Sequence, residues 1–425
     1  MMDNFLHVYI ESTKVGILTA RESGDYFFTY ESSWINSLAS IPLSLSLPLQ
    51  EESFTPEISK AFFSNLLPEG QIRDYFASKN RVSADDDFGL LAALGGDCAG
   101  ALALYPGSAE FTFEPGSVRY RQLNNDDMCK LLDEAYIMDP TFLDDEENTR
   151  LSLAGVQDKL PIAIREGAIY LPLDGSPSTH ILKPPNYRFP NLVENEAFCM
   201  TLAREMGLQV PDVSLLRVGE ADFFYLIERY DRNVDREGHL SRIHQEDFCQ
   251  ATEHSYRFKY EEGGGPGYRA CFQVIDYCRT PLIDRIKLID LVIFNYLICN
   301  ADSHAKNISL LYDRGSNPSL APFYDLVCTG IYPSLSSRLA MAIGGVYDSR
   351  DIDTKAWTCF TEQAGVASLK PVMATLNRMA LEISRKAEEI AIVMTKNYGE
   401  NEVYSQLVET ITNRAEIALR QVEKP

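Results

Sequence analysis

The sequence has 425 residues, of which 45% are hydrophobic and 24% are charged. Its 61 acidic residues against 39 Lys and Arg residues give a net charge of −22, which argues against unaided binding to nucleic acid or anionic membranes, since both require clustered cations. Nine cysteines without a C-x-x-C pair and six scattered histidines argue against a disulfide framework or a zinc site. The first residues lack a secretory signal, and the most apolar run, 288–299, is too short to cross a membrane. We therefore expect a cytoplasmic protein of two or three domains without membrane attachment.

In the first third of the chain, alternating apolar and polar residues predict a small antiparallel sheet, with strands over 7–10, 14–18 and 26–30. Next we expect a helix over 56–67, a helix capped by the acidic triplet 85–87, and a strand over 100–105. Turn-rich and acidic residues that follow predict a boundary near 140–150. We assign 1–148 to a β-rich N-terminal subdomain that also contributes to the next lobe.

The middle of the chain reads as a second β-rich unit, 149–235. Its expected elements are strands over 160–164, 168–173 and 180–183, a helix over 191–206, and a hairpin over 213–216 and 223–227. Beyond about 240 the pattern is helical, which predicts a helical lobe over 236–425. Its clearest helices are expected over 283–300, 376–396 and 402–422. The last helix reads as a packed terminal helix, with a partner-binding helix as the alternative.

The most informative motif is Asn300–Asn307, which follows the buried helix directly. Asp302 and Asn307 stand in the spacing D-x-x-x-x-N, which in protein kinases lets a loop present a carboxylate to the substrate hydroxyl and an Asn to a metal ion. Phe323-Tyr324-Asp325 follows an expected pair of short strands, and an Asp there can hold Mg²⁺. A chance D-x-x-x-x-N spacing and a turn role for Asp325 are the alternatives.

Two upstream segments carry cations suited to nucleotide phosphates. Lys183 ends an apolar strand just before two prolines, where an edge lysine that covers apolar surface is the other interpretation. The segment Leu151–Lys159 opens a hairpin, and small residues such as Ala154 and Gly155 let backbone N–H groups approach phosphates, with Lys159 adding charge. It is neither a G-x-G-x-x-G nor a Walker A loop.

Glu228-Arg229-Tyr230 ends the strand after 223–227, where a hinge between two lobes would meet an adenine; a surface Glu is the alternative. On the expected helix after Lys183, Glu196 could pair with that lysine, and Glu194 is an equal candidate.

In their order and spacing, these motifs resemble the HipA family of serine/threonine-protein kinases, the toxin halves of bacterial two-gene toxin–antitoxin modules. The stretches that carry the resemblance are Phe62–Gly70, Gly95–Gly100, Ser152–Lys159, His180–Pro184, Asn195–Ala197, Arg242–Asp247, Lys259-Tyr260 with Gly263–Gly267, Asn300–Asn307 and Phe323–Asp325. The resemblance implies an α+β, two-lobed, protein-kinase-like fold with an N-terminal β-rich subdomain and an all-helical C-terminal part.

The same resemblance implies roles for individual residues. Asp302 would be the catalytic carboxylate, and Asn307 and Asp325 would hold Mg²⁺. ATP would be bound by Ala154, Gly155, Val156, Gln157, Asp158, Lys159, Lys183, Glu228, Arg229, Tyr230, His304, Lys306, Tyr324 and the two metal ligands. Ser152 matches the autophosphorylated serine of family members, where a phosphate would repel those of ATP; a loop cap is the alternative.

The implied function is that of an ATP- and Mg²⁺-dependent kinase that arrests growth by phosphorylating a translation component such as an aminoacyl-tRNA synthetase. The implied partner is a small helix-turn-helix antitoxin of HipB type, through which the acidic kinase would contact operator DNA as co-repressor. Two alternatives stay open: a small-molecule kinase of lipid or aminoglycoside type, and a catalytically idle co-repressor. Gly263–Gly267 reads as a turn before a helix, with a substrate-positioning role as the alternative.

Overall fold

An antiparallel sheet forms the start of the chain in the computed structural model, which describes residues 4–96, 98–107, 119–132, 159–173, 175–186, 188–218, 222–234, 240–312 and 317–423. Its strand order is β3-β2-β1-β4, with bounds β1 Phe5–Ile10, β2 Thr13–Ala20, β3 Tyr26–Tyr30 and β4 Leu102–Pro106. Leu6, Val8 and Leu18 are buried, as the alternation predicts. Gly16 is required where β2 meets β3, because a Cβ there would lie 2.4 Å from the Phe28 ring.

The helices of this subdomain lie between β3 and β4, with bounds α1 Ser32–Ile35, α2 Pro56–Phe63, α3 Gly70–Lys79 and α4 Asp87–Leu94. Thr55 caps α2 by accepting a hydrogen bond from the N–H of Ile58, and Asp86 caps α4 by accepting from the N–H of Gly89. The acidic triplet therefore starts a helix, as its sequence predicts. Between α2 and α3 a 3₁₀ turn leads to Glu69, which is buried.

A six-stranded antiparallel sheet forms the second unit, in the order β5-β7-β6-β8-β10-β9. The strands are β5 Arg119–Gln122, β6 Leu160–Arg165, β7 Ala168–Leu173, β8 His180–Lys183, β9 Val213–Val218 and β10 Asp222–Glu228. The outer strand β5 comes from the segment that the sequence assigns to the N-terminal subdomain. Helix α7, Leu192–Glu205, packs against β9 and β10. At the far end, α5 (Asn125–Lys130) contributes Met128 to a separate small core with Leu160 and Phe224.

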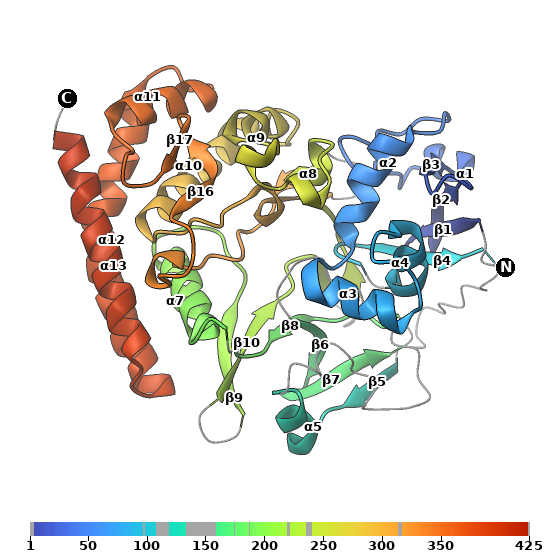
Figure 1. Ribbon diagram of the computed structural model, residues 1–425, viewed down its shortest axis with the longest axis horizontal. Coiled ribbons are helices and arrows are strands. Elements are labelled where there is room, and N and C mark those ends of the chain that lie inside the picture. The colour runs from blue at the N-terminus through green and yellow to red at the C-terminus, as the bar shows by residue number, and fades with distance from the viewer. Residues whose placement is uncertain are drawn as a thin grey trace.

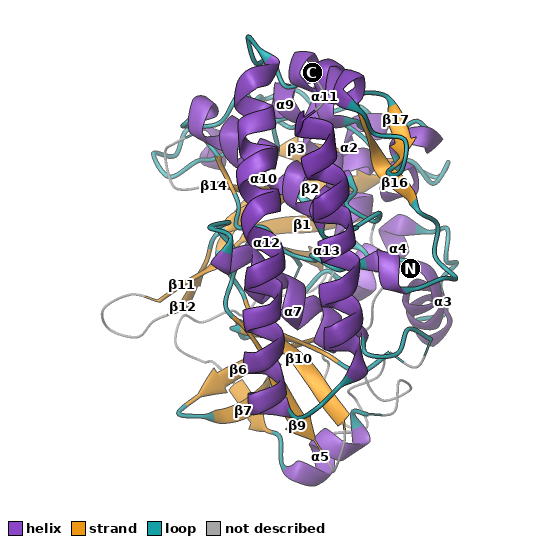
Figure 2. Ribbon diagram, turned by 90° about the vertical axis from the view of Figure 1, so that its left-hand side faces the viewer, coloured by secondary structure: helices purple, strands orange, loops and turns teal. Residues whose placement is uncertain are grey.

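The C-terminal lobe is built mainly from helices. Their bounds are α8 Phe248–Ala251, α9 Tyr268–Ile275, α10 Pro281–Leu297, α11 Thr354–Gln363, α12 Leu369–Tyr398 and α13 Glu402–Glu423. Figure 1 shows α12 and α13 at the opposite end of the molecule from the N-terminal sheet, and Figure 2 shows them running side by side. No helix in these described ranges is both long enough and apolar enough to cross a membrane.

Short strands interrupt the helical lobe. They are β11 Arg232–Val234, β12 Leu240–Arg242, β13 His244–Asp247, β14 Ser309–Tyr312, β15 Ser319–Leu320, β16 Arg338–Ile343 and β17 Val346–Asp348. The two-lobed α+β fold is as expected, but its C-terminal part is purely helical only from Thr354 on. The reason is that β14, which follows the Asn300–Asn307 loop, pairs with both β13 and β15, and that β16 pairs with β17.

A buried polar interface attaches the N-terminal subdomain to the rest of the molecule. Glu246, which is 0% exposed, accepts hydrogen bonds from Ser44 Oγ, the N–H of Leu45 and Tyr312 Oη. Burial raises the pKa of Glu246 to about 7, because the charged form loses its hydration. Close by, Asn65 Nδ2 donates to the carbonyl of His254 at 2.8 Å. The subdomain is therefore held at a defined position beside the loops that form the cavity described next.

Candidate active site

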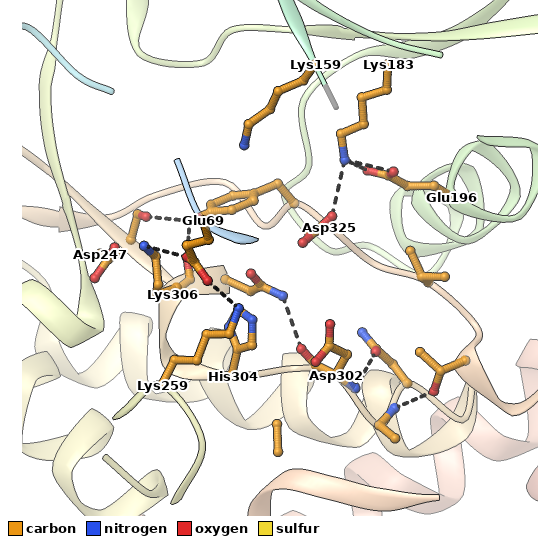
Figure 3. A pocket seen from close by; sticks show the side chains of 18 of the residues that line it. Glu69, Lys159, Lys183, Glu196, Asp247, Lys259, Asp302, His304, Lys306 and Asp325 are labelled. Carbon is orange, nitrogen blue, oxygen red and sulfur yellow. Dashed lines mark hydrogen bonds and ion pairs between the residues drawn. The ribbon is translucent and has the colours of Figure 1, made fainter. Parts of the chain in front are cut away.

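A cavity of about 780 Å³ lies where the N-terminal subdomain, the six-stranded sheet and the C-terminal lobe meet. Every described residue that the sequence assigns to the site lines it: Lys159, Lys183, Glu228, Arg229, Tyr230, Asp302, His304, Lys306, Asn307, Tyr324 and Asp325. Figure 3 shows Lys159 and Lys183 extending into the cavity from one side, with Asp302 and His304 on the opposite side. Segments far apart in the sequence thus converge on one volume large enough for a nucleotide-sized ligand.

The remaining predicted residues are in a segment that lies outside the described residues. They are Ser152, Ala154, Gly155, Val156, Gln157 and Asp158.

Lys183 ends β8 and makes a buried ion pair with the next helix. Its Nζ lies 2.8 and 2.9 Å from the two carboxylate oxygens of Glu196 on α7 and 3.2 Å from Oδ1 of Asp325. Burial alone would lower the pKa of Lys183, but these carboxylates outweigh it and keep the pKa above its usual value. Of the two glutamates that the sequence offers, Glu196 makes this pair. Lys183 therefore carries its charge at neutral pH.

Lys159 lies just before β6 and shares the cavity with Lys183. Burial, reinforced by the positive charge of Lys183, lowers the pKa of Lys159 to about 8. Two ammonium groups on one side of a cavity are suited to an anionic ligand such as a phosphate chain.

Asp325 stands in a left-handed backbone conformation with φ of 60°, which Asp tolerates better than most residues. Partial burial would raise the pKa of Asp325, but Lys183 and Lys159 outweigh it and hold this pKa below its ordinary value. Asp325 is therefore ionised at neutral pH and faces the cavity.

The Asn300–Asn307 loop is held by a chain of polar contacts. Asn300 Nδ2 donates to Oδ1 of Asn295 on α10 at 2.9 Å, and Asn300 Oδ1 accepts from the N–H of Asp302 at 3.0 Å. Asn307 Nδ2 donates to the carbonyl of Asp302 at 3.2 Å. From the other side, Thr329 accepts from the N–H of Ala301 at 2.8 Å. These bonds orient the backbone of the loop while the Asp302 side chain remains exposed.

Contacts of Asn307 also decide which of its side-chain atoms can serve a metal. Its amide nitrogen is engaged by the Asp302 carbonyl, so the amide oxygen is the atom that remains for a cation. With the Asp325 carboxylate, this makes a pair of oxygen donors, which suits Mg²⁺ better than softer metals.

His304 and Lys306 occupy the centre of the loop and are both buried. Burial lowers the pKa of His304, so its ring is neutral at pH 7. Lys306 Nζ lies 3.0 Å from Oε1 of Glu69, and Lys259 Nζ donates to Oε2 of the same carboxylate at 2.8 Å. Although burial opposes it, these two cations lower the pKa of Glu69 to about 2.

At the strand end after β10, the rings of Tyr230 and Tyr324 stack with centroids 5.7 Å apart. Tyr324 Oη donates to the Lys306 carbonyl at 2.8 Å. Arg229 is committed elsewhere, because its guanidinium donates to both oxygens of Asp231 at 2.9 and 2.7 Å. The Tyr230 and Tyr324 rings thus offer a flat apolar wall, whereas the Arg229 side chain serves the structure of the hinge.

The structure brings into the cavity three further residues that the sequence motifs do not assign to it. Glu69 and the pair Lys259-Tyr260 line it, and Tyr260 Oη donates to Oδ1 of Asp302 at 2.8 Å. All three stand inside stretches that carry the family resemblance, so a signal existed. Their partners are distant in sequence, and no local pattern joins them.

Two family models match the chain. The HipA N-terminal domain matches residues 6–105, and the HipA-like C-terminal domain matches residues 151–394. Protein Y4mE of Sinorhizobium fredii is 38% identical over 421 residues, covering 97% of this chain and 98% of that protein. The serine/threonine-protein kinase toxin HipA of Shewanella oneidensis is 30% identical over 404 residues, with 92% and 90% covered.

A solved structure agrees over nearly the entire length. It is the complex of HipA, HipB and operator DNA from Shewanella oneidensis, with a TM-score of 0.84 and 28% identity over 99% of this chain and 98% of that one. The cavity gathers the kinase-type residues, and both family models match the chain in order. The chain therefore belongs to the HipA family and is a protein kinase.

Proposed function

We propose that this kinase transfers the γ-phosphate of ATP to a serine or threonine hydroxyl in a Mg²⁺-dependent reaction. One observation carries the proposal: Asp302, Asn307 and Asp325 line a single cavity together with the Lys183–Glu196 ion pair. These are the parts that phosphoryl transfer requires, since catalysis there consists of positioning and charge stabilisation.

Each residue has a distinct task. Asp302 accepts the proton of the attacking serine or threonine hydroxyl. The hydroxyl oxygen bonds to the γ-phosphorus while the bond between this phosphorus and the β-phosphate oxygen breaks, which releases ADP. Asn307 and Asp325 would hold Mg²⁺, which neutralises phosphate charge when bound. Lys183 and Lys159 would face the phosphates. The family resemblance assigns the backbone N–H groups of residues 154–158, which lie outside the described residues, to the same phosphates. By the family resemblance, His304 and Lys306 would also contribute to the ATP site.

The adenine is proposed to lie near Glu228, Tyr230 and Tyr324. The stacked rings of Tyr230 and Tyr324 give an apolar surface for the base, and the strand end at Glu228 gives backbone groups for its edge. Arg229 contributes through the backbone, because its side chain is bonded to Asp231.

On the biological level, we propose a toxin that phosphorylates a translation component, such as an aminoacyl-tRNA synthetase, and is controlled by phosphorylation of its own Ser152. A HipB-type helix-turn-helix antitoxin would be its cytoplasmic partner and would carry most contacts with operator DNA. The net charge of −22 supports this division, because the acidic kinase repels phosphates and attracts a basic partner.

The decisive experiment incubates purified protein with Mg²⁺ and [γ-³²P]ATP, with and without a host extract, and maps the phosphopeptides. We expect phosphate on Ser152 and on one main host protein, and none with Asp302→Asn. Phosphate on small molecules alone would favour the small-molecule kinase. Growth is measured separately, with the wild type or Asp302→Asn overexpressed. Growth inhibition that is unchanged by Asp302→Asn would favour the idle co-repressor.

A further inference from the structure

Tyr260 makes two contacts with the Asn300–Asn307 loop, which is the catalytic loop of the proposed reaction. Its hydroxyl donates to Oδ1 of Asp302 at 2.8 Å, and its ring meets the His304 ring edge-on with centroids 5.4 Å apart. Tyr260 itself is 42% exposed. Its contacts therefore belong to the cavity and not to the hydrophobic core.

The segment that carries Tyr260 is anchored on both sides. We call Lys259–Glu262 the strap. Lys259 pairs with Glu69 of the N-terminal subdomain at 2.8 Å, Glu261 accepts from the N–H of Ala342 at 2.6 Å, and Glu262 pairs with Arg338 at 2.7 Å. The strap thus bridges the N-terminal subdomain and β16.

Two glycines after the strap form a turn that no other residue type would fit, and this turn holds the strap in place. Gly264 has φ of 92°, and the N–H of Gly265 donates to the carbonyl of Tyr260 at 3.0 Å. A Cβ on Gly265 would lie 1.9 Å from the carbonyl oxygen of Phe258. Gly264 and Gly265 form a tight turn that returns the chain to α9 and holds the Tyr260 backbone.

Asp302 needs such an anchor. Its backbone is fixed by Asn300, but its side chain is exposed, and among the described residues it has no ion-pair partner within 4.0 Å. A carboxylate that is free to rotate would sample several orientations. The Tyr260 hydroxyl engages Oδ1 and leaves Oδ2 free to accept a proton from an incoming hydroxyl.

We propose that Tyr260 is a positioning residue that orients the Asp302 carboxylate toward the phosphate acceptor, and that the strap forms the acceptor side of the cavity. The inference rests on the proposed kinase reaction and deepens it. The strap contacts Asp302 and Arg338. The Lys183–Glu196 pair and Tyr230, in contrast, belong to the proposed nucleotide site. The acceptor chain therefore lies against the strap and the segment 335–340, which the Glu262–Arg338 pair joins and whose Leu335, Ser336 and Arg338 also line the cavity.

The test is the substitution Tyr260→Phe, which removes one hydroxyl and keeps the ring against His304. Its matched control is Tyr277→Phe, because Tyr277 is 64% exposed and does not line the cavity. Rates of ³²P transfer from [γ-³²P]ATP to the chain itself and to dephosphorylated casein are measured against ATP concentration, together with the melting temperature.

We expect Tyr260→Phe to lower the rate at saturating ATP by about tenfold, as for loss of a hydrogen bond to a charged group. The KM for ATP and the melting temperature stay at their wild-type values, and Tyr277→Phe behaves as wild type. If Tyr260→Phe transfers phosphate at an unchanged or a faster rate, the inference is overturned. A faster rate would mean that Tyr260 merely occupies the position of the acceptor. A raised KM for ATP or a lowered melting temperature overturns it too.

Asp302→Asn separates this inference from the proposed function. If the wild-type protein shows no phosphotransfer, or transfers phosphate no faster than Asp302→Asn, the kinase reaction is refuted and the inference with it. An active wild type, an inactive Asp302→Asn and a fully active Tyr260→Phe refute the role of Tyr260 alone.

Discussion

The carboxylate of Glu69 lies 3.0 Å from the ammonium group of Lys306 and so joins the N-terminal subdomain to the catalytic loop. The same carboxylate binds Lys259 of the strap at 2.8 Å. One buried acidic residue therefore connects three parts of the chain around the cavity. This makes the N-terminal subdomain a part of the candidate active site and not merely an addition to a kinase core.

We predict that Glu69→Gln lowers both activity and stability. The buried Lys306 and the partly buried Lys259 would lose their shared carboxylate, which costs about 3 kcal/mol of the free energy of unfolding by analogy with broken buried ion pairs. Phosphotransfer should fall by about tenfold or more, because Lys306 and Tyr260 would both lose their support.

Urea denaturation and initial rates measure the two effects. The matched control is Glu51→Gln in the same subdomain, where the side chain is exposed and little change is expected. Wild-type stability of Glu69→Gln would contradict the prediction.

The Lys183–Glu196 pair permits a double-mutant cycle. Lys183→Met leaves the Glu196 carboxylate, which is 0% exposed, without its cation, so the free energy of unfolding should fall by about 3–5 kcal/mol and nucleotide binding should weaken. The double variant Lys183→Met, Glu196→Leu should be more stable than Lys183→Met, because the unpaired buried charge is gone.

Glu194→Gln is the natural control for this cycle, since Glu194 stands two residues away on the same helix and lies outside the pair. It should keep most of the nucleotide affinity. Additive effects of the two substitutions at Lys183 and Glu196 would show that the pair has no coupling energy.

Nucleotide binding should be linked to proton uptake near pH 8. Without bound nucleotide, Lys159 has a pKa of about 8. Phosphates nearby favour its charged form, so binding of Mg²⁺·ADP raises this pKa and takes up a fraction of a proton. Affinity should therefore fall as the pH rises through 8. For the free protein, the unfolded chain binds more protons than the folded one above pH 8, so this lysine makes stability rise with pH there.

Calorimetric titrations at pH 8, in two buffers with different heats of ionisation, report the proton uptake directly. Lys159→Gln should abolish it, and Lys355→Gln on the exposed face of α11 should leave it intact. Equal proton uptake in wild type and Lys159→Gln would refute the assignment.

Glu246 should make the docking of the N-terminal subdomain depend on pH. Its pKa of about 7 lies above the usual value, so the folded protein holds a proton that the unfolded chain has released, and stability decreases as the pH rises from about 4.5 to 7. Glu246→Gln cannot ionise. Between pH 5 and 8 its free energy of unfolding should therefore gain about 2–3 kcal/mol relative to wild type.

Urea denaturation at several pH values measures this difference, with Glu51→Gln again as the control. A constant difference between Glu246→Gln and wild type across this range would show that Glu246 does not titrate there.

Local patterns in the sequence were enough for much of the fold. Alternation predicts β1 to β3, the acidic triplet predicts the start of α4, and the apolar run predicts α10, because each depends on neighbours in sequence. The helix α12 begins earlier than expected, at Leu369 instead of near residue 376. Its first turns hold fewer buried apolar residues, so their periodicity is weak.

Through its resemblance to the HipA family, the sequence by itself indicated the two-lobed kinase-like fold, and the spacing of Asp302, Asn307, Asp325 and Lys183 indicated the residue types of the candidate site. Only the tertiary structure decided that Glu196 and not Glu194 pairs with Lys183, that Glu69 supports Lys306, and that Tyr260 holds Asp302. These are contacts between residues 13, 237 and 42 positions apart in the chain. The physical reason is that an ion pair or hydrogen bond depends on distance in space, which short-range sequence patterns do not encode.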